Sequence, residues 1–244
     1  MSLLEVRKLS KRFGGIQALT EVSLEVVQGK IVGVAGPNGA GKTTLFNCIS
    51  GYSPFVDGTV HFDDHDIGNQ RPHKICRLGL ARTFQIVRPF RDMTVLENAM
   101  VGAYAGARGQ DAQRAALGAL AALGMLDMAD LDAGSLGTAD QRRLEIARAV
   151  ATGPKLLLLD ETMAGLTGSE AQDMCNRIRA LRDGGLSILM IEHSVPIMRS
   201  LCDEIAVLNF GTILGQGPPE EILQTKIVQE AYLGITADAD TDSL

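Results

Sequence analysis

Apolar residues recur at two spacings along this chain, and the change of spacing divides it into expected strands and helices. Alternating apolar positions at Leu4–Leu9 and Val22–Val26 are typical of half-buried strands. The unbroken apolar run 31–35 predicts a buried strand, and a helical spacing from Lys42 predicts a helix that ends at Gly51. A strand, a glycine-rich loop and a helix are therefore expected in this order.

The second half of the chain first becomes helical and then returns to buried strands. The segment 103–122 is rich in Ala and Leu, and we expect a mostly helical subdomain over about 88–153. Apolar runs at Leu156–Leu159 and Ser187–Ile191 predict two buried strands, with a helix over Ser169–Arg182 between them. This order predicts a right-handed crossover and parallel strands.

Shorter elements complete the expected α/β organisation. A strand at Gly58–Phe62 precedes an acidic turn, and Arg82–Gln85 is expected to be extended. A hairpin is predicted through 209–211, and a helix that begins with Pro218 follows it. The polar tail 236–244 is predicted to be disordered.

Composition restricts the classes of function. The 244 residues, of which 45% are hydrophobic and 21% charged, suffice for one large domain or two small ones. The net charge of −6 argues against a nucleic-acid-binding surface. No apolar run approaches the roughly 20 residues that a membrane span needs, and the charges of the first residues leave no apolar region for a signal peptide. We therefore expect a cytoplasmic protein that binds no nucleic acid.

Cysteines and histidines are scattered along the chain. The four cysteines form no Cys-x-x-Cys motif and have no pair of histidines at metal-ligand spacing, so we expect them to be reduced. His61, His65 and His73 lie in a loop-rich segment and are expected to be solvated. His193 differs from them because it follows a predicted buried strand.

A phosphate-binding motif lies between the buried strand 31–35 and the following helix. Residues 36–43 read G-P-N-G-A-G-K-T and match G-x-x-x-x-G-K-[S/T] in the context that this motif requires. Glycines let successive backbone N–H groups point at phosphate oxygens, at the positive end of the helix. Lys42 is expected to hold the β- and γ-phosphates, and Thr43 to bind a magnesium ion. The other interpretation is a glycine turn that binds no ligand. The predicted contact residues are Gly36, Pro37, Asn38, Gly39, Ala40, Gly41, Lys42, Thr43 and Thr44.

An acidic pair, Asp160-Glu161, follows the buried strand at Leu156–Leu159. Two adjacent carboxylates at the carboxyl end of a buried strand suit a cation site near a phosphate loop. We predict that Asp160 binds magnesium through its water shell and that Glu161 accepts the proton of the attacking water. The alternative is that Asp160 caps a helix and Glu161 is a solvated neighbour.

Together with Gln85 and with Ile191-Glu192-His193, these motifs resemble the nucleotide-binding subunit of ATP-binding cassette (ABC) transporters over about 3–235. The resemblance implies one P-loop NTPase domain over 1–235. In that domain a mostly parallel core sheet is joined by an N-terminal antiparallel β subdomain and the helical subdomain. It also implies ATP and Mg²⁺ as cofactors.

The resemblance assigns roles to three further residues. Gln85 fits the family's Q-loop, which senses the γ-phosphate through magnesium and water and connects to the membrane partner. His193 fits the switch histidine that contacts the γ-phosphate. Phe13 fits the aromatic residue that stacks on adenine, although a single Phe near a strand is more often part of a core.

Four segments are similar to those of bacterial branched-chain amino acid importers, whose two different ATPase subunits serve one permease pair; urea and amide importers are also similar. The segments are 82–85, 93–98, 141–149 and 230–234. The resemblance implies a location at the cytoplasmic face of the membrane and permease partners that dock around Gln85–Glu97. It also implies indirect dependence on a separate substrate-binding protein, so this chain cannot name the ligand.

The family's signature segment departs from its usual form at Leu136–Asp140. Gly137 lacks the usual hydroxyl, Ala139 replaces a glycine, and Asp140 replaces Gln. A methyl group at Ala139 would obstruct close approach if the backbone required a positive φ there, and a carboxylate at 140 repels phosphate. Other departures are Thr162 in place of Pro, Thr167 in place of Asp or Asn, and Ser194 in place of Asp.

In this family the signature acts on the nucleotide of the opposite subunit, whereas the intact motifs act on the chain's own nucleotide. This contrast suggests a heterodimer, favoured over a homodimer, in which a second ATPase subunit supplies an intact signature. One alternative is a subunit that binds ATP without hydrolysing it. Another is a soluble ABC protein that acts on nucleic acid or ribosomes, which the negative charge disfavours.

Overall fold

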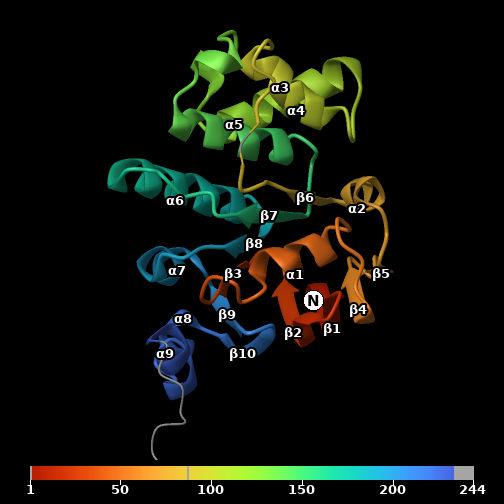
Figure 1. Ribbon diagram of the computed structural model, residues 1–244. Helices are drawn as coiled ribbons and strands as arrows, with labels where there is room; N and C mark the ends of the chain where they lie inside the picture. Colours follow the sequence, from red (N-terminus) through yellow and green to blue (C-terminus); the bar gives the residue numbers. More distant parts are fainter. Residues whose placement is uncertain (1, 87, 234–244) are drawn as a thin grey trace, which may run out of the picture.

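The computed structural model describes residues 2–86 and 88–233, which form two β-sheets and several groups of helices (Figure 1). The tail predicted to be disordered, 236–244, lies outside the described residues. Within them, no helix has both the length and the apolar composition that crossing a bilayer needs.

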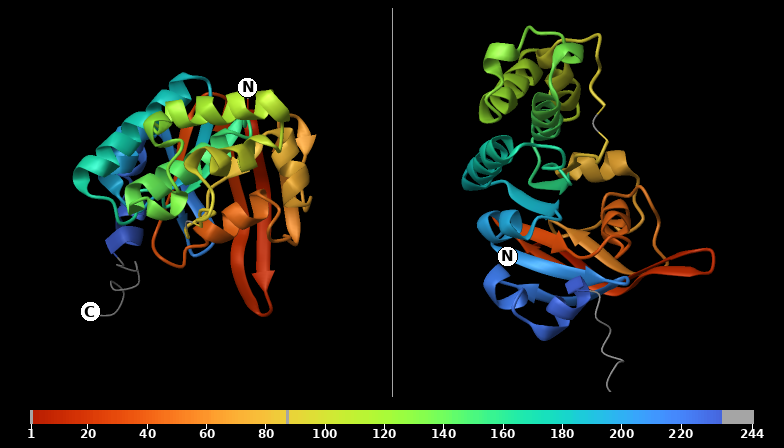
Figure 2. Two further views of the ribbon diagram at one scale, coloured as in Figure 1. Left: turned by 90° about the horizontal axis from the view of Figure 1, so that it is seen from above. Right: turned by 60° about the vertical axis from the view of Figure 1, so that its left-hand side comes forward.

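The smaller sheet is antiparallel and has the strand order β2-β1-β4-β5. Its register places Leu4 opposite both Val26 and Phe62, so the alternating apolar positions of the sequence share one buried face. The β1–β2 hairpin extends beyond the rest of the sheet (Figure 2). The strands are β1 (Ser2–Phe13), β2 (Ile16–Val27), β4 (Asp57–Phe62) and β5 (His65–Asp66).

The larger sheet has the order β10-β9-β3-β8-β7-β6, in which only β10 runs antiparallel to its neighbour. Strands β3, β7 and β8 are buried along their whole length, as their continuous apolar sequences predict. The strands are β3 (Ile31–Ala35), β6 (Leu80–Arg82), β7 (Leu156–Asp160), β8 (Ser187–Ile191), β9 (Glu204–Asn209) and β10 (Thr212–Gly217).

One predicted extended segment is shifted. The strand expected at Arg82–Gln85 is β6, which begins at Leu80 and ends at Arg82. Its three residues pair in parallel with β7, and Thr83 adds one more backbone hydrogen bond, to Leu158, before the chain leaves the sheet. The pairing with β7 therefore sets the strand ends, which a short apolar run does not define.

The helices cover both faces of the larger sheet, and α3, α4 and α5 form a separate group beyond its β6–β7 edge (Figure 1). The Ala-rich stretch 103–122 is divided between two helices, because α3 ends where that stretch begins. Two 3₁₀ turns lie at Leu126–Met128 and Ala133–Ser135. The helices are α1 (Lys42–Ile49), α2 (Pro72–Leu78), α3 (Val95–Ala103), α4 (Gly109–Ala122), α5 (Thr138–Val150), α6 (Gly168–Asp183), α7 (Val195–Leu201), α8 (Pro219–Ile222) and α9 (Lys226–Leu233).

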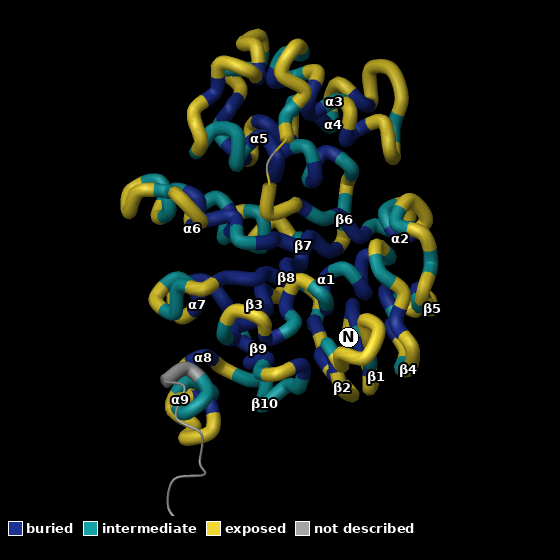
Figure 3. The backbone as a smooth tube through the Cα atoms, in the orientation of Figure 1, coloured by how far each residue is buried: buried dark blue, intermediate teal, exposed yellow. Residues whose placement is uncertain are grey.

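Alternate residues of the central strands enter two different cores. In β7, Leu157 and Leu159 pack with the helices α3–α6, whereas Leu156 and Leu158 pack with α1 and the smaller sheet. The central strands are the most buried part of the chain (Figure 3). All four cysteines are free, as expected. Packing on both faces holds the carboxyl ends of β3, β7 and β8 at one edge, where parallel sheets place their ligand sites.

Candidate functional site

The loop between β3 and α1 has the backbone that its glycines permit. Gly36, Gly39 and Gly41 have φ values of 141°, 81° and 108°, which side-chain-bearing residues rarely adopt. A methyl group at Gly36 would also overlap the carbonyl oxygen of Leu208. Gly41 caps α1 without a side-chain hydrogen bond, so the first N–H groups of the helix are available to an anion.

Lys42 is held at the centre of this loop. Its side chain is nearly buried, and Nζ donates hydrogen bonds to the carbonyl oxygens of Gly36 (2.7 Å) and Pro37 (2.9 Å). Burial lowers the pKa of the ammonium group, while the carboxylates of Glu161 and Asp160 raise it. The cation therefore lies between the phosphate loop and the acidic pair.

Glu161 is bonded to both of the other residues for which a catalytic role was predicted. Gln85 Nε2 donates to Glu161 Oε2 at 2.9 Å, and His193 Nε2 lies 2.7 Å from Oε1. The backbone of Glu161 is left-handed, with φ of 51°, and its N–H donates to Ile191 on β8. Glu161 and His193 line one cavity of about 200 Å³ together with residues 38–44 of the phosphate loop. The fold thus gathers residues from three distant parts of the sequence.

Asp160 ends β7 with a side chain that is 1% exposed. Its Oδ2 accepts a hydrogen bond from Arg82 Nη2 at 2.9 Å, whereas Oδ1 is buried and has no hydrogen-bond partner among the described residues. Burial raises the pKa of this carboxyl group, and Arg82 opposes that shift. The helix-cap alternative for Asp160 is wrong, because Thr167 caps the next helix, α6.

The three predicted magnesium ligands share one cavity. Thr43, Gln85 and Asp160 all line a cavity of about 430 Å³. An alcohol, an amide and a carboxylate supply oxygen atoms of the kind that magnesium prefers. Oδ1 of Asp160 has no hydrogen-bond partner in the described part of the chain, and a cation with its water shell would satisfy this buried charge.

Phe13 does not line either cavity that the other predicted site residues share. It ends β1 on the extended hairpin, is 51% exposed, and its ring centroid is 4.5 Å from Lys11 Nζ. The core alternative is therefore wrong for this residue. Phe13 is not among the residues that line the cavity beside the phosphate loop, so its contact with adenine stays a prediction.

The signature segment has an ordinary backbone. Gly137 caps α5, and Thr138, Ala139 and Asp140 form its first turn, so Ala139 has a helical conformation and its methyl group causes no backbone strain. The condition for an obstruction by the Ala139 methyl group, a positive φ, is therefore not met. Asp140 is paired with Arg143 at 3.3 Å, and none of residues 136–140 lines the cavity beside the phosphate loop.

Three charged residues that the sequence did not single out complete the site. Arg82 pairs with Asp160; Glu145 on α5 accepts a hydrogen bond from the N–H of Phe84 at 2.9 Å; Glu192 accepts one from the N–H of Met163 at 3.0 Å. Burial raises the pKa values of both glutamates. The only sequence signal was a charge within or next to a recognised motif, and such a charge is usually solvated.

The fold and this site define the chain as a nucleotide-binding ATPase of the P-loop class. A family model described as ABC transporter matches residues 19–164. The chain is 39% identical to the high-affinity branched-chain amino acid transport ATP-binding protein BraF of Pseudomonas aeruginosa, over 95% of this chain and 98% of that protein. It is 41% identical to the corresponding protein LivG of Salmonella typhimurium, over the same shares of the two chains.

Solved structures agree with these sequence relatives. A nucleotide-free ATP-binding cassette from an ABC transporter superposes with a TM-score of 0.87 at 32% identity, over 95% of this chain and 99% of that one. The ADP conformation of the cassette MJ1267 has the same TM-score and identity, over 96% and 99%. The chain belongs to the ABC transporter family of ATPases, as an ATP-binding subunit. The resemblance inferred from its motifs is thereby confirmed.

Proposed function

We propose that this chain hydrolyses ATP to drive an importer of branched-chain amino acids. The observation that supports hydrolysis most directly is the placement of Glu161 between Gln85 and His193, beside the phosphate loop. The branched-chain specificity rests on the similarity to the branched-chain amino acid transport proteins BraF and LivG. A separate binding protein and the permease would select the ligand, and the same geometry would serve a urea or amide importer.

The proposed mechanism uses groups that lie close together around Glu161 and the phosphate loop. The loop N–H groups and Lys42 bind the phosphates, and Glu161 accepts the proton of the attacking water. Gln85 and His193 orient the Glu161 carboxylate through its two oxygen atoms. His193 also contacts the γ-phosphate. The alternative of binding without hydrolysis is less favourable, because neither Glu161 nor His193 is needed for binding itself.

Magnesium fits the donor set at the end of β7. Thr43, Gln85 and Asp160 would hold it, and the buried Oδ1 of Asp160 would face its water shell. When bound, the ion would neutralise charge that develops on the phosphate oxygens. Asp160 would hold the metal, and Glu161, the next residue, would accept the proton through a lone pair that its bonds to Gln85 and His193 leave over.

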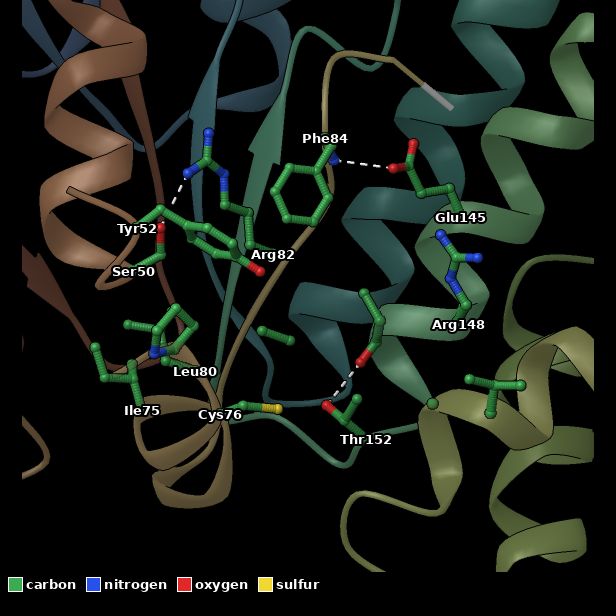
Figure 4. A pocket seen from close by; sticks show the side chains of 15 residues that line it. Ser50, Tyr52, Ile75, Cys76, Leu80, Arg82, Phe84, Glu145, Arg148 and Thr152 are labelled. Atoms are coloured by element: carbon green, nitrogen blue, oxygen red, sulfur yellow. Dashed lines mark hydrogen bonds between the residues drawn. The ribbon is translucent and has the colours of Figure 1, made fainter. Parts of the chain in front are cut away.

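The permease is proposed to dock beside the segment Gln85–Glu97, at a groove between the helical group α3–α5 and the rest of the chain. This groove, about 220 Å³ in volume, is lined by Tyr52 and Phe84 on one side and by Arg148 on the other (Figure 4). Val101 of α3 also lines it. Its apolar rings and flanking charges suit a short helix of a membrane partner. The chain would then lie peripherally on the cytoplasmic face of the membrane.

The degenerate signature suggests that this subunit pairs with a different ATPase subunit. Asp140 places a carboxylate in the first turn of α5, where the positive end of the helix would otherwise face phosphate. The nucleotide of the partner would then be bound but turned over slowly. The nucleotide of this chain would be hydrolysed against the partner's intact signature.

Coexpression with the permease and the partner ATPase tests this assignment. Glu161→Gln should abolish most of the ATPase activity of the assembled complex, and the equivalent change in the partner should have a small effect. The reverse result would place the active site in the partner. With the substrate-binding protein added, stimulation of ATPase activity by leucine, isoleucine or valine, compared with urea, would then test the importer class.

A further inference from the structure

Arg82 has a side chain that is only 5% exposed, and it connects α1 with β7. Nη2 donates to Asp160 Oδ2 at 2.9 Å, and Nη1 donates to Asn47 Oδ1 at 2.7 Å and to Ser50 Oγ at 2.9 Å. Asn47 and Ser50 lie at the end of α1, the helix that starts at the phosphate loop. The guanidinium group thus bonds both to the helix that carries the phosphate loop and to the predicted magnesium carboxylate.

Aromatic rings enclose the same guanidinium group. Its central carbon lies 5.2 Å from the ring centroid of Phe84, 5.6 Å from that of Phe46 and 5.9 Å from that of Tyr52, within the range of cation–π attraction. Tyr52 and Phe84 meet edge to face, with ring centroids 5.4 Å apart. Both belong to the groove proposed for the permease, where they are 55% and 40% exposed (Figure 4).

These contacts give the two oxygens of Asp160 different environments. Arg82 occupies Oδ2 and leaves Oδ1 without a partner among the described residues. A planar guanidinium group with three hydrogen-bond acceptors around it has little freedom to rotate, and a lysine could not bond to all three in the same directions. The rings of Phe84, Phe46 and Tyr52 therefore pack against the same guanidinium group that bonds to Oδ2 of Asp160.

We propose that Arg82 is a positioning residue that presents Oδ1 of Asp160 to magnesium and makes this presentation depend on the rings in the groove. The magnesium part stands on the contacts of Arg82 itself, and the part about what occupies the groove rests on the proposed function. Movement of Tyr52 or Phe84 by a docked partner thus changes metal binding through Arg82.

The test measures metal-dependent binding of a fluorescent ATP analogue to the isolated full-length chain. Arg82→Lys keeps the positive charge and loses the fixed geometry. The magnesium concentration at half-saturation should rise about tenfold, which corresponds to about 1.4 kcal/mol. Affinity for the analogue in EDTA should change less than twofold. With Mn²⁺ in place of Mg²⁺, the electron paramagnetic resonance spectrum of the bound ion should also change.

Groove variants provide the second part of the test and a matched control. Tyr52→Ala alters an exposed ring that contacts Arg82, so it should raise the magnesium half-saturation about threefold in a normally folded chain. Val101→Ala trims a residue of the same groove without removing an Arg82 contact, and it should cause no shift.

Two results would overturn the proposal: an unchanged metal half-saturation in folded Arg82→Lys and Tyr52→Ala, or an equal shift in Val101→Ala. If Arg82→Lys does not fold, Tyr52→Ala decides. Either result would leave the ATPase assignment intact. These experiments use the isolated chain without a permease, and they measure only how the metal supports binding of the analogue. A wild-type chain that binds no ATP analogue would contradict the proposed function instead.

Discussion

Glu145 shows how the surroundings of one residue change its chemistry. Its side chain lies between α5 and the segment after β6, where Oε1 accepts the Phe84 N–H and Oε2 has no partner among the described residues. Burial raises the pKa of this carboxyl group, and the Phe84 hydrogen bond, Arg148 and Arg142 oppose the shift. A raised pKa means that the folded chain holds this proton at pH values where the unfolded chain has released it.

We predict that Glu145→Gln changes how the free energy of unfolding depends on pH. The stability that Glu145 contributes should be largest at acidic pH and should decline as the pH rises above the ordinary carboxyl value of 4.5. The free energy of unfolding of the wild type minus that of the variant should therefore decrease between pH 5 and pH 8. Urea denaturation at several pH values measures this difference. An increase over the same range would contradict the assigned environment.

At the scale of elements, the helical group depends on a close approach between α3 and α5. Gly102 on α3 lies against the backbone of Arg148 on α5, and a methyl group at this position would overlap the Arg148 carbonyl oxygen. The backbone conformation of Gly102 is ordinary, so only space requires a glycine here. At this point the two helices can approach each other this closely only because residue 102 has no side chain.

We expect Gly102→Ala to destabilise the chain by about 1–3 kcal/mol, because the helices must move apart or distort. Gly118→Ala on α4 is the matched control: an added methyl group there meets nothing within 4 Å. That change should stabilise the chain by up to about 1 kcal/mol through helix propensity. Denaturant titration of both variants measures their free energies of unfolding. Equal changes in the two variants would show that α3 and α5 do not approach each other this closely at Gly102.

Helix α6 begins with a regular cap although Thr167 departs from the family pattern. Thr167 accepts a hydrogen bond from the N–H of Glu170, and the Glu170 carboxylate accepts one from the N–H of Thr167. Threonine and aspartate both cap helices well. Replacement of the usual Asp or Asn by Thr therefore preserves the start of this helix.

At the scale of the whole molecule, the proposed pairing predicts how the isolated chain assembles. With ATP, the Glu161→Gln chain should remain monomeric, because Asp140 brings a carboxylate toward the phosphate of the facing copy. Adding Gly137→Ser and Asp140→Gln should permit ATP-dependent dimers, which light scattering after gel filtration detects. The same changes with Lys42→Ala serve as the control and should give no dimer. Stable ATP-dependent dimers of the Glu161→Gln chain without the two signature changes would contradict the proposed heterodimer.

Contiguous stretches of the sequence determine several local structural features of this protein. The glycine pattern at 36–41 requires a loop with positive φ values, and the apolar runs of β3, β7 and β8 require burial on both faces. Residue type and short-range spacing indicate such features without knowledge of the tertiary contacts. The phosphate loop and the position of the acidic pair at the end of a strand were therefore predictable from the sequence.

The tertiary structure decided which distant groups meet. Gln85 and His193 are 76 and 32 residues from Glu161, and their contacts depend on β6, β7 and β8 being neighbours in one sheet. Likewise, no local pattern indicates that Arg82 is buried against Asp160, because its burial depends on rings and polar groups brought from other elements. Sequence spacing governs what one segment can form, whereas strand order and packing govern which charges share a site.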